Sequence, residues 1–164
     1  MLDAPVIGAL RGRALGAAKR LGIVDRVTPA GMTRERRREW PSREEAKAHF
    51  RTRQLFRHFT EECLEDYVRH GLVGRHGHYR LRIDPEIEYR IYRTIPHDMS
   101  RHLRALTVPA GFVGGTHSDV LRRVGMRAMR GSRFLKRRVA GGHLFPFEQP
   151  LAAAAAIEDL LGEL

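Results

Sequence analysis

The last third of the chain alternates short apolar runs with helical stretches, and this alternation restricts the fold more than any other feature. Residues 108–113 form an apolar run that ends in Gly114-Gly115, and a helical segment follows. Residues 134–139 then read as a second strand that ends in Gly141-Gly142-His143. Pro150 begins the last helix, whose predicted apolar face is Ala154, Ile157, Leu160 and Leu161. Strands that alternate with helices in this way predict a right-handed parallel α/β unit. Because two strands are too few for a complete α/β sheet, we expect the others to come from upstream or from a partner.

The region before residue 105 reads mainly as helices. Ser42 stands three residues before Glu45, which is the spacing of a reciprocal capping box. Thr60 and Asp84-Pro85 are the corresponding start signals of two further helices. Residues 79–83 alternate like a short strand. The aromatic residues of this region are interpreted as its core; they are Trp40, Phe50, Phe56, Phe59 and Tyr67.

Charge and composition restrict the class of protein. The formal net charge is +11, from 30 lysines and arginines against 19 acidic residues. A basic chain can bind nucleic acid through phosphate neutralisation. No RNA-binding aromatic signature, zinc-finger spacing or basic zipper accompanies the charge, so we interpret it as a solvated surface and expect no nucleic-acid partner.

The sequence also gives expectations about disulfides, metal ions, membrane spans and cellular location. Cys63 is the only cysteine, which excludes an internal disulfide framework. His76 and His78 flank Gly77 without a third ligand nearby, and zinc sites need three or four, so we expect no metal. No apolar run reaches the roughly 18 residues of a membrane span, and the N-terminus lacks the pattern of a signal peptide. We therefore expect a cytoplasmic protein without membrane contact.

Residues 139–150, Val-Ala-Gly-Gly-His-Leu-Phe-Pro-Phe-Glu-Gln-Pro, resemble the end of α/β-hydrolase chains. In that family a loop after the last strand presents the catalytic histidine, and a final helix closes the fold. Residues 106–115 resemble the preceding strand, whose end usually carries the acid. The resemblance implies a partial α/β-hydrolase fold, with a helical cap followed by the last two parallel strands and helices of the core sheet. Residues 1–5 would end strand six, residues 6–105 would form the cap, and residues 106–164 would form the C-terminal part of the core.

The resemblance also implies roles for individual residues. His143 would accept the proton of the nucleophile and return it to the leaving group. Asp119 would hold the imidazole tautomer and stabilise its cation. Asp119 could instead serve only as a helix cap. Asp3, at the expected end of strand six, is the alternative acid.

The family's nucleophile lies in a Gly-x-Ser-x-Gly elbow. These 164 residues contain no such motif, because none of the four serines has these flanking glycines; they are Ser42, Ser100, Ser118 and Ser132. We therefore expect the chain alone to be inactive. The complete enzyme would be an esterase-like hydrolase that acts on an ester, amide or related bond of a small molecule without a cofactor. The alternative is a non-catalytic binding or assembly module that pairs with a complementing N-terminal chain or with a second copy of itself.

Overall fold

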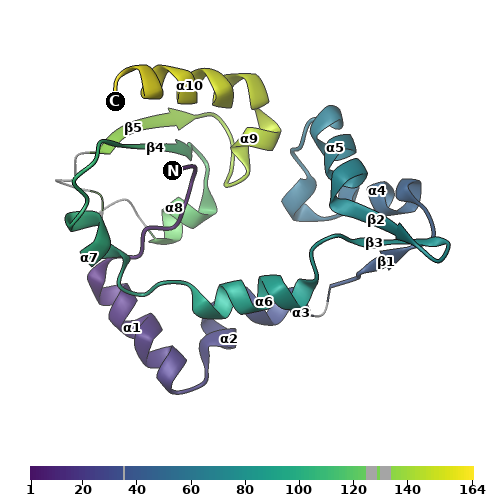
Figure 1. Ribbon diagram of the computed structural model, residues 1–164, viewed down its shortest axis with the longest axis horizontal. Coiled ribbons are helices and arrows are strands. Elements are labelled where there is room, and N and C mark those ends of the chain that lie inside the picture. The colour runs from purple at the N-terminus through teal and green to yellow at the C-terminus, as the bar shows by residue number, and fades with distance from the viewer. Residues whose placement is uncertain (35, 125–128, 130–133) are drawn as a thin grey trace. The chain divides into compact units, whose positions relative to one another are not determined.

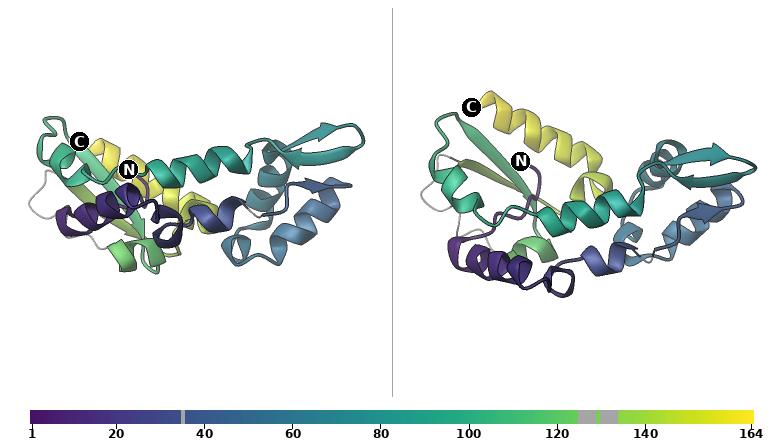
Figure 2. Two further views of the ribbon diagram at one scale, coloured as in Figure 1. Left: turned by 90° about the horizontal axis from the view of Figure 1, so that it is seen from below. Right: turned by 60° about the horizontal axis from the view of Figure 1, so that its bottom comes forward.

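The computed structural model describes residues 1–34, 36–124, 129 and 134–164, so Ser132 lies outside it (Figures 1 and 2). The chain forms two compact units, one of Met1–Ala14 with Pro96–Leu164 and the other of Leu15–Ile95. Helix α1 (Ala9–Arg20) crosses the first boundary. The predicted combination of helices with a parallel pair of strands is confirmed. The interpretation of the middle region as a cap stays a prediction.

The unit that holds both chain ends is built on two parallel strands. Strand β4 (Ala110–Gly115) pairs with β5 (Phe134–Val139), with Ala110 opposite Phe134 and Gly115 opposite Val139. The predicted bounds of the second strand are confirmed, and the first begins two residues later than predicted. On the other edge of β4, Leu2 forms a parallel bridge to Val113. Strand β4 therefore lies between Leu2 and β5. The assignment of residues 1–5 to the end of strand six stays a prediction.

Side chains alternate across this sheet and enter two separate clusters. On one face, Phe112 and Phe134 pack with Val6, Leu121 and Met129. On the other face, a cluster lies against helix α10 (Pro150–Gly162); its members are Val113, Val139, Phe145, Ala153 and Leu160. Figure 1 shows α10 running along β5. The described part of this unit also contains the first turns of α1 and the short helices α7 (Met99–Arg104), α8 (Asp119–Val124) and α9 (Phe145–Glu148).

The buried face of α10 differs from the predicted one. The sequence predicted that Ala154, Ile157, Leu160 and Leu161 would face the core. The structure buries Ala153 and Leu160, with Ile157 packed beside them, whereas Ala154 and Leu161 are exposed. Residues 152–156 are all alanine, so the apolar pattern does not fix the rotation of the helix there.

The unit Leu15–Ile95 combines helices with a small antiparallel sheet. After the end of α1 come α2 (Val24–Val27), α3 (Ala30–Arg34), α4 (Arg43–Arg51), the 3₁₀ turn η1 (Gln54–Phe56), α5 (Glu61–Gly71) and α6 (Pro85–Thr94). The sheet has the order β1 (Glu39–Trp40), β3 (His78–Leu81), β2 (Leu72–Arg75). The sequence predicted β3 but neither of its neighbours. Figure 2 shows the β2–β3 hairpin extending beyond the helices of its unit.

The predicted helix starts of this unit are confirmed at atomic detail. The Ser42 hydroxyl accepts a hydrogen bond from the Glu45 N–H at 3.1 Å, and Thr60 accepts one from Cys63 at 3.2 Å. The Asp84 carboxylate accepts one from the Glu86 N–H at 2.9 Å. Each side chain satisfies a backbone donor that the first helical turn leaves without a partner.

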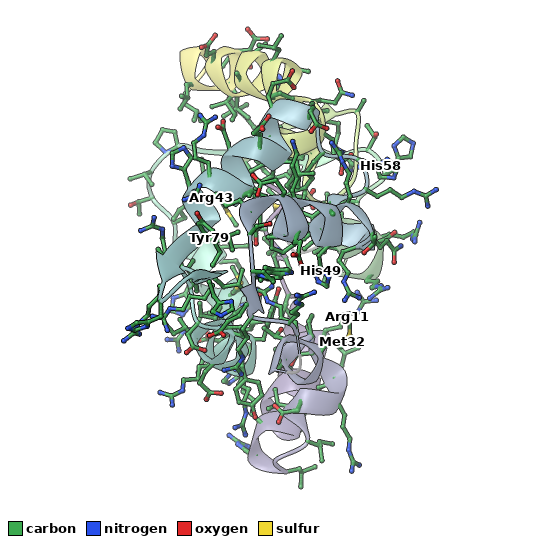
Figure 3. The ribbon with its side chains drawn as sticks, turned by 90° about the vertical axis from the view of Figure 1, so that its right-hand side faces the viewer. Arg11, Met32, Arg43, His49, His58 and Tyr79 are labelled. Atoms are coloured by element: carbon green, nitrogen blue, oxygen red, sulfur yellow. The ribbon has the colours of Figure 1, made fainter. Side chains whose placement is uncertain are left out.

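An aromatic cluster forms the core of this unit, as predicted. Trp40, Phe50, Phe56 and Phe59 are at least 94% buried, and the rings of Phe50 and Phe56 lie 4.9 Å apart. The Tyr67 ring joins them at 4.8 Å from Phe56. At the surface, the Arg43 guanidinium lies 5.1 Å from the centre of the Tyr79 ring (Figure 3). Leu55 is exposed, because α4 ends at Arg51 and Leu55 lies in η1.

Candidate functional site

Three segments that are far apart in the sequence meet where β4 and β5 end. The Asp3 N–H donates to the Val113 carbonyl at 2.8 Å, which fixes the first residues beside β4. The loop after β4 is joined to the loop after β5, because the Thr116 N–H donates to Val139 and the His117 N–H donates to Gly141, both at 2.9 Å. The carboxyl ends of parallel strands lie at one edge of a sheet, and this edge is the usual place for a site in open α/β folds.

The Asp3 carboxylate is the centre of this meeting point. The residue is 1% exposed. One oxygen, Oδ1, accepts the Gly115 N–H at 2.9 Å. The other, Oδ2, accepts the Ser118 hydroxyl at 2.5 Å and lies 2.6 Å from Nδ1 of His143. Three partners thus compensate for the loss of hydration of a buried carboxylate.

The backbone of Asp3 adopts a conformation that costs free energy. Its φ is +40°, in the left-handed region that disfavours residues with a side chain. A non-glycine residue there costs about 1–2 kcal/mol. Such strain persists where the surrounding structure fixes it, and it is concentrated at functional sites. Here the hydrogen bonds of the Asp3 carboxylate and N–H hold the residue in place.

The His143 ring extends from the loop between β5 and α9. Its side chain is 40% exposed, so one edge of the ring reaches solvent while Nδ1 meets the buried carboxylate. When Nδ1 donates its proton to Asp3, the neutral ring carries its lone pair on Nε2. Within the described part of the chain, Nε2 has no hydrogen-bond partner. The accessible nitrogen is therefore an acceptor.

Two glycines of the loop shape the approach to His143. Gly141 has a φ of +131°, a conformation that L side chains rarely adopt. The Gly142 N–H donates to the Glu148 carboxylate at 2.9 Å, which ties the loop to α9. On the neighbouring loop, a Cβ on Gly115 would overlap the carbonyl oxygens of Gly141 and Gly142. The two loops can approach this closely only because Gly115 lacks a side chain.

The structure brings His143 together with Asp3, the alternative acid, and leaves Asp119 out of this contact. Asp119 is the first residue of α8, and its carboxylate pairs with Arg122 at 2.5 Å on the exposed surface of the helix. Among the described contacts, none joins Asp119 to His143. Asp119 lies next to the capping residue Ser118, so its side chain projects from the first turn of α8 toward solvent.

The hydroxyl of Ser118 is the site contact that the sequence did not reveal. Ser118 directly precedes α8, a position where serine is a common cap. It does cap α8, because its oxygen accepts the Leu121 N–H at 3.2 Å. Its hydrogen bond to Asp3 joins residues 115 positions apart, and no local pattern indicates a contact over that distance.

The other histidine candidates give no metal site in the described residues, where no group of three or more His, Cys, Asp or Glu side chains is placed to hold an ion. His76 and His78 stand on the β2–β3 hairpin, in the unit that does not contain His143. None of the helices in the described ranges is both long and apolar enough to cross a membrane.

Solved structures that resemble this chain include an α/β-hydrolase, another hydrolase and a thioesterase domain. The peroxisomal α/β-hydrolase Lpx1 from Saccharomyces cerevisiae superimposes with a TM-score of 0.67 at 12% identity, over 98% of this chain and 42% of that protein. E-2-(acetamidomethylene)succinate hydrolase gives a TM-score of 0.65 at 15% identity, over 97% of this chain and 55% of that one. The thioesterase domain from the curacin biosynthetic pathway gives 0.61 at 17% identity, over 96% and 55%. Comparison with protein-family models and with curated proteins gives no match.

These similarities confirm the predicted fold class. The chain has part of the α/β-hydrolase fold and spans about half the length of the solved structures it matches. At identities of 12–17%, the likeness concerns the fold alone.

Proposed function

We propose that Asp3 and His143 are the acid and the general base of a hydrolase that cleaves an ester, amide or related bond of a small molecule. The observation that carries this proposal is the 2.6 Å contact between the buried Asp3 carboxylate and Nδ1 of a half-exposed His143. A carboxylate in this position holds the imidazole in one tautomer and stabilises the cation that forms when Nε2 takes a proton. Nε2 would accept the proton of a nucleophile and return it to the leaving group.

The nucleophile in this proposal comes from outside these 164 residues. The sequence contains no Gly-x-Ser-x-Gly motif, and the one serine at the site, Ser118, already donates its hydroxyl to Asp3. A serine oxygen that donates to Asp3 is not activated by Nε2 of His143. We therefore infer that a further segment, in the same polypeptide or in a complementing chain, supplies a nucleophile and an oxyanion hole.

Hydrolysis of p-nitrophenyl esters tests the two roles in a form of the protein that includes the nucleophile. We expect His143→Ala and Asp3→Asn each to lower kcat/KM by on the order of 10³–10⁴-fold, since the base is removed or loses its orienting carboxylate. Asp119→Asn is the matched control. It makes the same chemical change at an exposed ion pair and should alter kcat/KM by less than about twofold. A larger loss in Asp119→Asn than in Asp3→Asn would contradict the assignment of the acid.

Labelling with a fluorophosphonate probe tests the origin of the nucleophile. We expect the 164-residue chain alone to take up no label on serine, because the activated hydroxyl and the oxyanion donors are needed together. Labelling that a single change such as Ser118→Ala abolishes would place the nucleophile within this chain and contradict the inference.

The alternative proposal, an assembly module that pairs with another chain, is supported by the strand edge at Leu2. Residues 1–3 bond to β4 on one side, and within the described residues no strand pairs with their other side. Unpaired backbone groups at a strand edge can bind a further strand. The two proposals are compatible if that strand belongs to the segment that carries the nucleophile.

A further inference from the structure

The outer face of the β2–β3 hairpin carries a group of basic side chains that the proposed hydrolysis does not use. Arg75 stands opposite His78 in the strand pairing, and Arg80 follows two residues later on the same face of β3. His76 occupies the turn. Together with Glu39 these residues line a surface hollow of about 340 Å³. The opposite face of the sheet carries Trp40 and Leu72, which are buried, so the two faces are clearly distinguished.

The two arginines of this hollow differ from most arginines of the same unit. Arg36 pairs with Glu88 at 2.8 Å, Arg93 with Asp25 at 3.1 Å, and Arg90 with Glu86 at 3.2 Å. In contrast, the guanidinium groups of Arg75 and Arg80 make no hydrogen bond or ion pair with any residue that the structure describes. Glu39 is the register partner of Arg80, yet no ion pair forms between them in that part of the chain. The guanidinium donors remain available to a ligand.

The turn of the hairpin gives a second, independent observation. His76 and Gly77 have φ values of +48° and +78°, the signs required at the two central positions of a tight turn that joins twisted strands. Asn or Asp before Gly is the usual choice at the first of these positions. Histidine stands there instead, in a backbone region where strain is associated with function. His76 thus places an imidazole in the lining of the hollow.

We propose that this hollow binds the phosphoryl group of a phosphorylated small molecule. Two guanidinium groups offer planar, paired N–H donors that match phosphate oxygens, and each neutral imidazole adds one N–H. Diagonal neighbours across an antiparallel pair lie about 7–8 Å apart, so Arg75 and Arg80 can approach one anion from two sides. The Glu39 carboxylate at the rim repels anions, so the two guanidinium groups have to outweigh it. This site lies in the unit Leu15–Ile95 and does not depend on the proposed hydrolase activity.

Calorimetric titration of the 164-residue chain with inorganic phosphate and with pyrophosphate tests the proposal. We expect saturable binding of at least one of the two, weakened about tenfold by Arg75→Gln or by Arg80→Gln, because each change removes charge-assisted hydrogen bonds. Arg26→Gln is the matched control, since Arg26 is also exposed and without a described partner but lies outside the hollow. Its affinity should stay within a factor of two of the unchanged protein.

The variant His76→Asn separates binding from folding. Asparagine is favoured at this turn position, so the hairpin should keep its structure while the imidazole is lost. Fluorescence of Trp40, the single tryptophan, monitors the fold beside β3. We expect an unchanged spectrum with severalfold weaker binding. Absence of saturable binding would overturn the proposal. Equal weakening of binding by Arg26→Gln would also overturn the proposal. So would tight binding of a single-stranded oligonucleotide that all three arginine changes reduce alike. Either result would indicate general charge attraction.

Discussion

The Ser118 hydroxyl connects the proposed acid to a helix. It donates to Asp3 Oδ2 at 2.5 Å and accepts the Leu121 N–H at 3.2 Å, and the residue is 3% exposed. One oxygen thus satisfies a buried carboxylate and a backbone donor of the first turn of α8. Because Oδ2 also contacts His143, Ser118 helps to position the carboxylate against the ring. We therefore regard Ser118 as a positioning residue of the site.

The change Ser118→Ala tests this role. We expect it to lower the free energy of unfolding by about 1–3 kcal/mol, because a helix cap is lost and a buried carboxylate loses a donor. In a form that includes the nucleophile, kcat should fall more than KM rises, since the carboxylate loses its orientation rather than its contact with substrate.

Ser42→Ala provides the matched control for this change. Ser42 caps α4 through the Glu45 N–H in the same way but belongs to the other unit. The change Ser42→Ala should lower the free energy of unfolding by about 1 kcal/mol and leave kcat unchanged. Equal effects of the two changes on kcat would show that Ser118 acts only through stability.

Residues with a local signal could be predicted from the sequence, and residues defined by distant partners could not. His143 follows two glycines at the end of a predicted strand, so its position in a loop at the sheet edge was predictable. Asp3 and Asp119 both follow strand-like segments, so the sequence does not show which of them is the acid. The choice depends on which carboxylate contacts the His143 ring, which is 140 positions from Asp3. The pairing of residues 1–3 with Val113 brings Asp3 beside the loop, and this contact is between residues more than 100 positions apart.

Among the secondary-structure elements, the end of β4 and the loop after β5 pack most closely at Gly115. A Cβ on Gly115 would lie 2.6 Å from the Gly141 carbonyl oxygen and closer still to that of Gly142. Both neighbours are backbone atoms, which cannot rotate away as a side chain does. The backbone of the histidine loop would have to move, and the contact between His143 and Asp3 would change with it.

We expect Gly115→Ala to lower the free energy of unfolding by about 2–4 kcal/mol, as overpacking against backbone does. Gly162→Ala is the control, because no atom lies within 4 Å of a Cβ built there and the residue ends α10. It should be neutral or slightly stabilising, since alanine favours the helix. Urea unfolding of both variants measures the difference. A stable Gly115→Ala protein with its loop contacts intact would contradict the packing argument.

Helices and strands were predictable from the sequence where the apolar pattern agrees with the residues that begin or end the element. Residues 134–139 were predicted as a strand with the observed bounds, despite three basic residues within it. The caps at Ser42, Thr60 and Asp84 fixed three helix starts. Strand β1 has two residues and β2 contains Gly74, so neither has the length or alternation that predicts a strand. Their pairing with β3 depends on tertiary contacts, which the local sequence pattern does not show.

Over the whole chain, net charge and exposed apolar surface have opposite effects on association between copies. The net charge of +11 opposes association between copies. Apolar side chains nevertheless remain at the surface of the unit that holds both chain ends. Leu2 is 47% exposed at the strand edge, and Leu151 and Leu161 on α10 are 86% and 63% exposed. Exposed apolar surface of this kind favours association.

We expect the isolated chain to associate, with itself or with a partner, and to do so more strongly as salt is added. The Debye length falls from about 10 Å at 0.1 M salt to about 3 Å at 1 M, so repulsion between copies weakens while the apolar contacts and strand edges are unaffected. Light scattering at the two salt concentrations measures the mass of the species. Leu151→Gln should reduce association if α10 takes part, whereas Thr94→Ser, a polar change at the exposed end of α6, should not. A monomer that unfolds cooperatively at both salt concentrations would mean that these 164 residues form a self-sufficient domain, and the proposal that another segment completes the sheet would then be wrong.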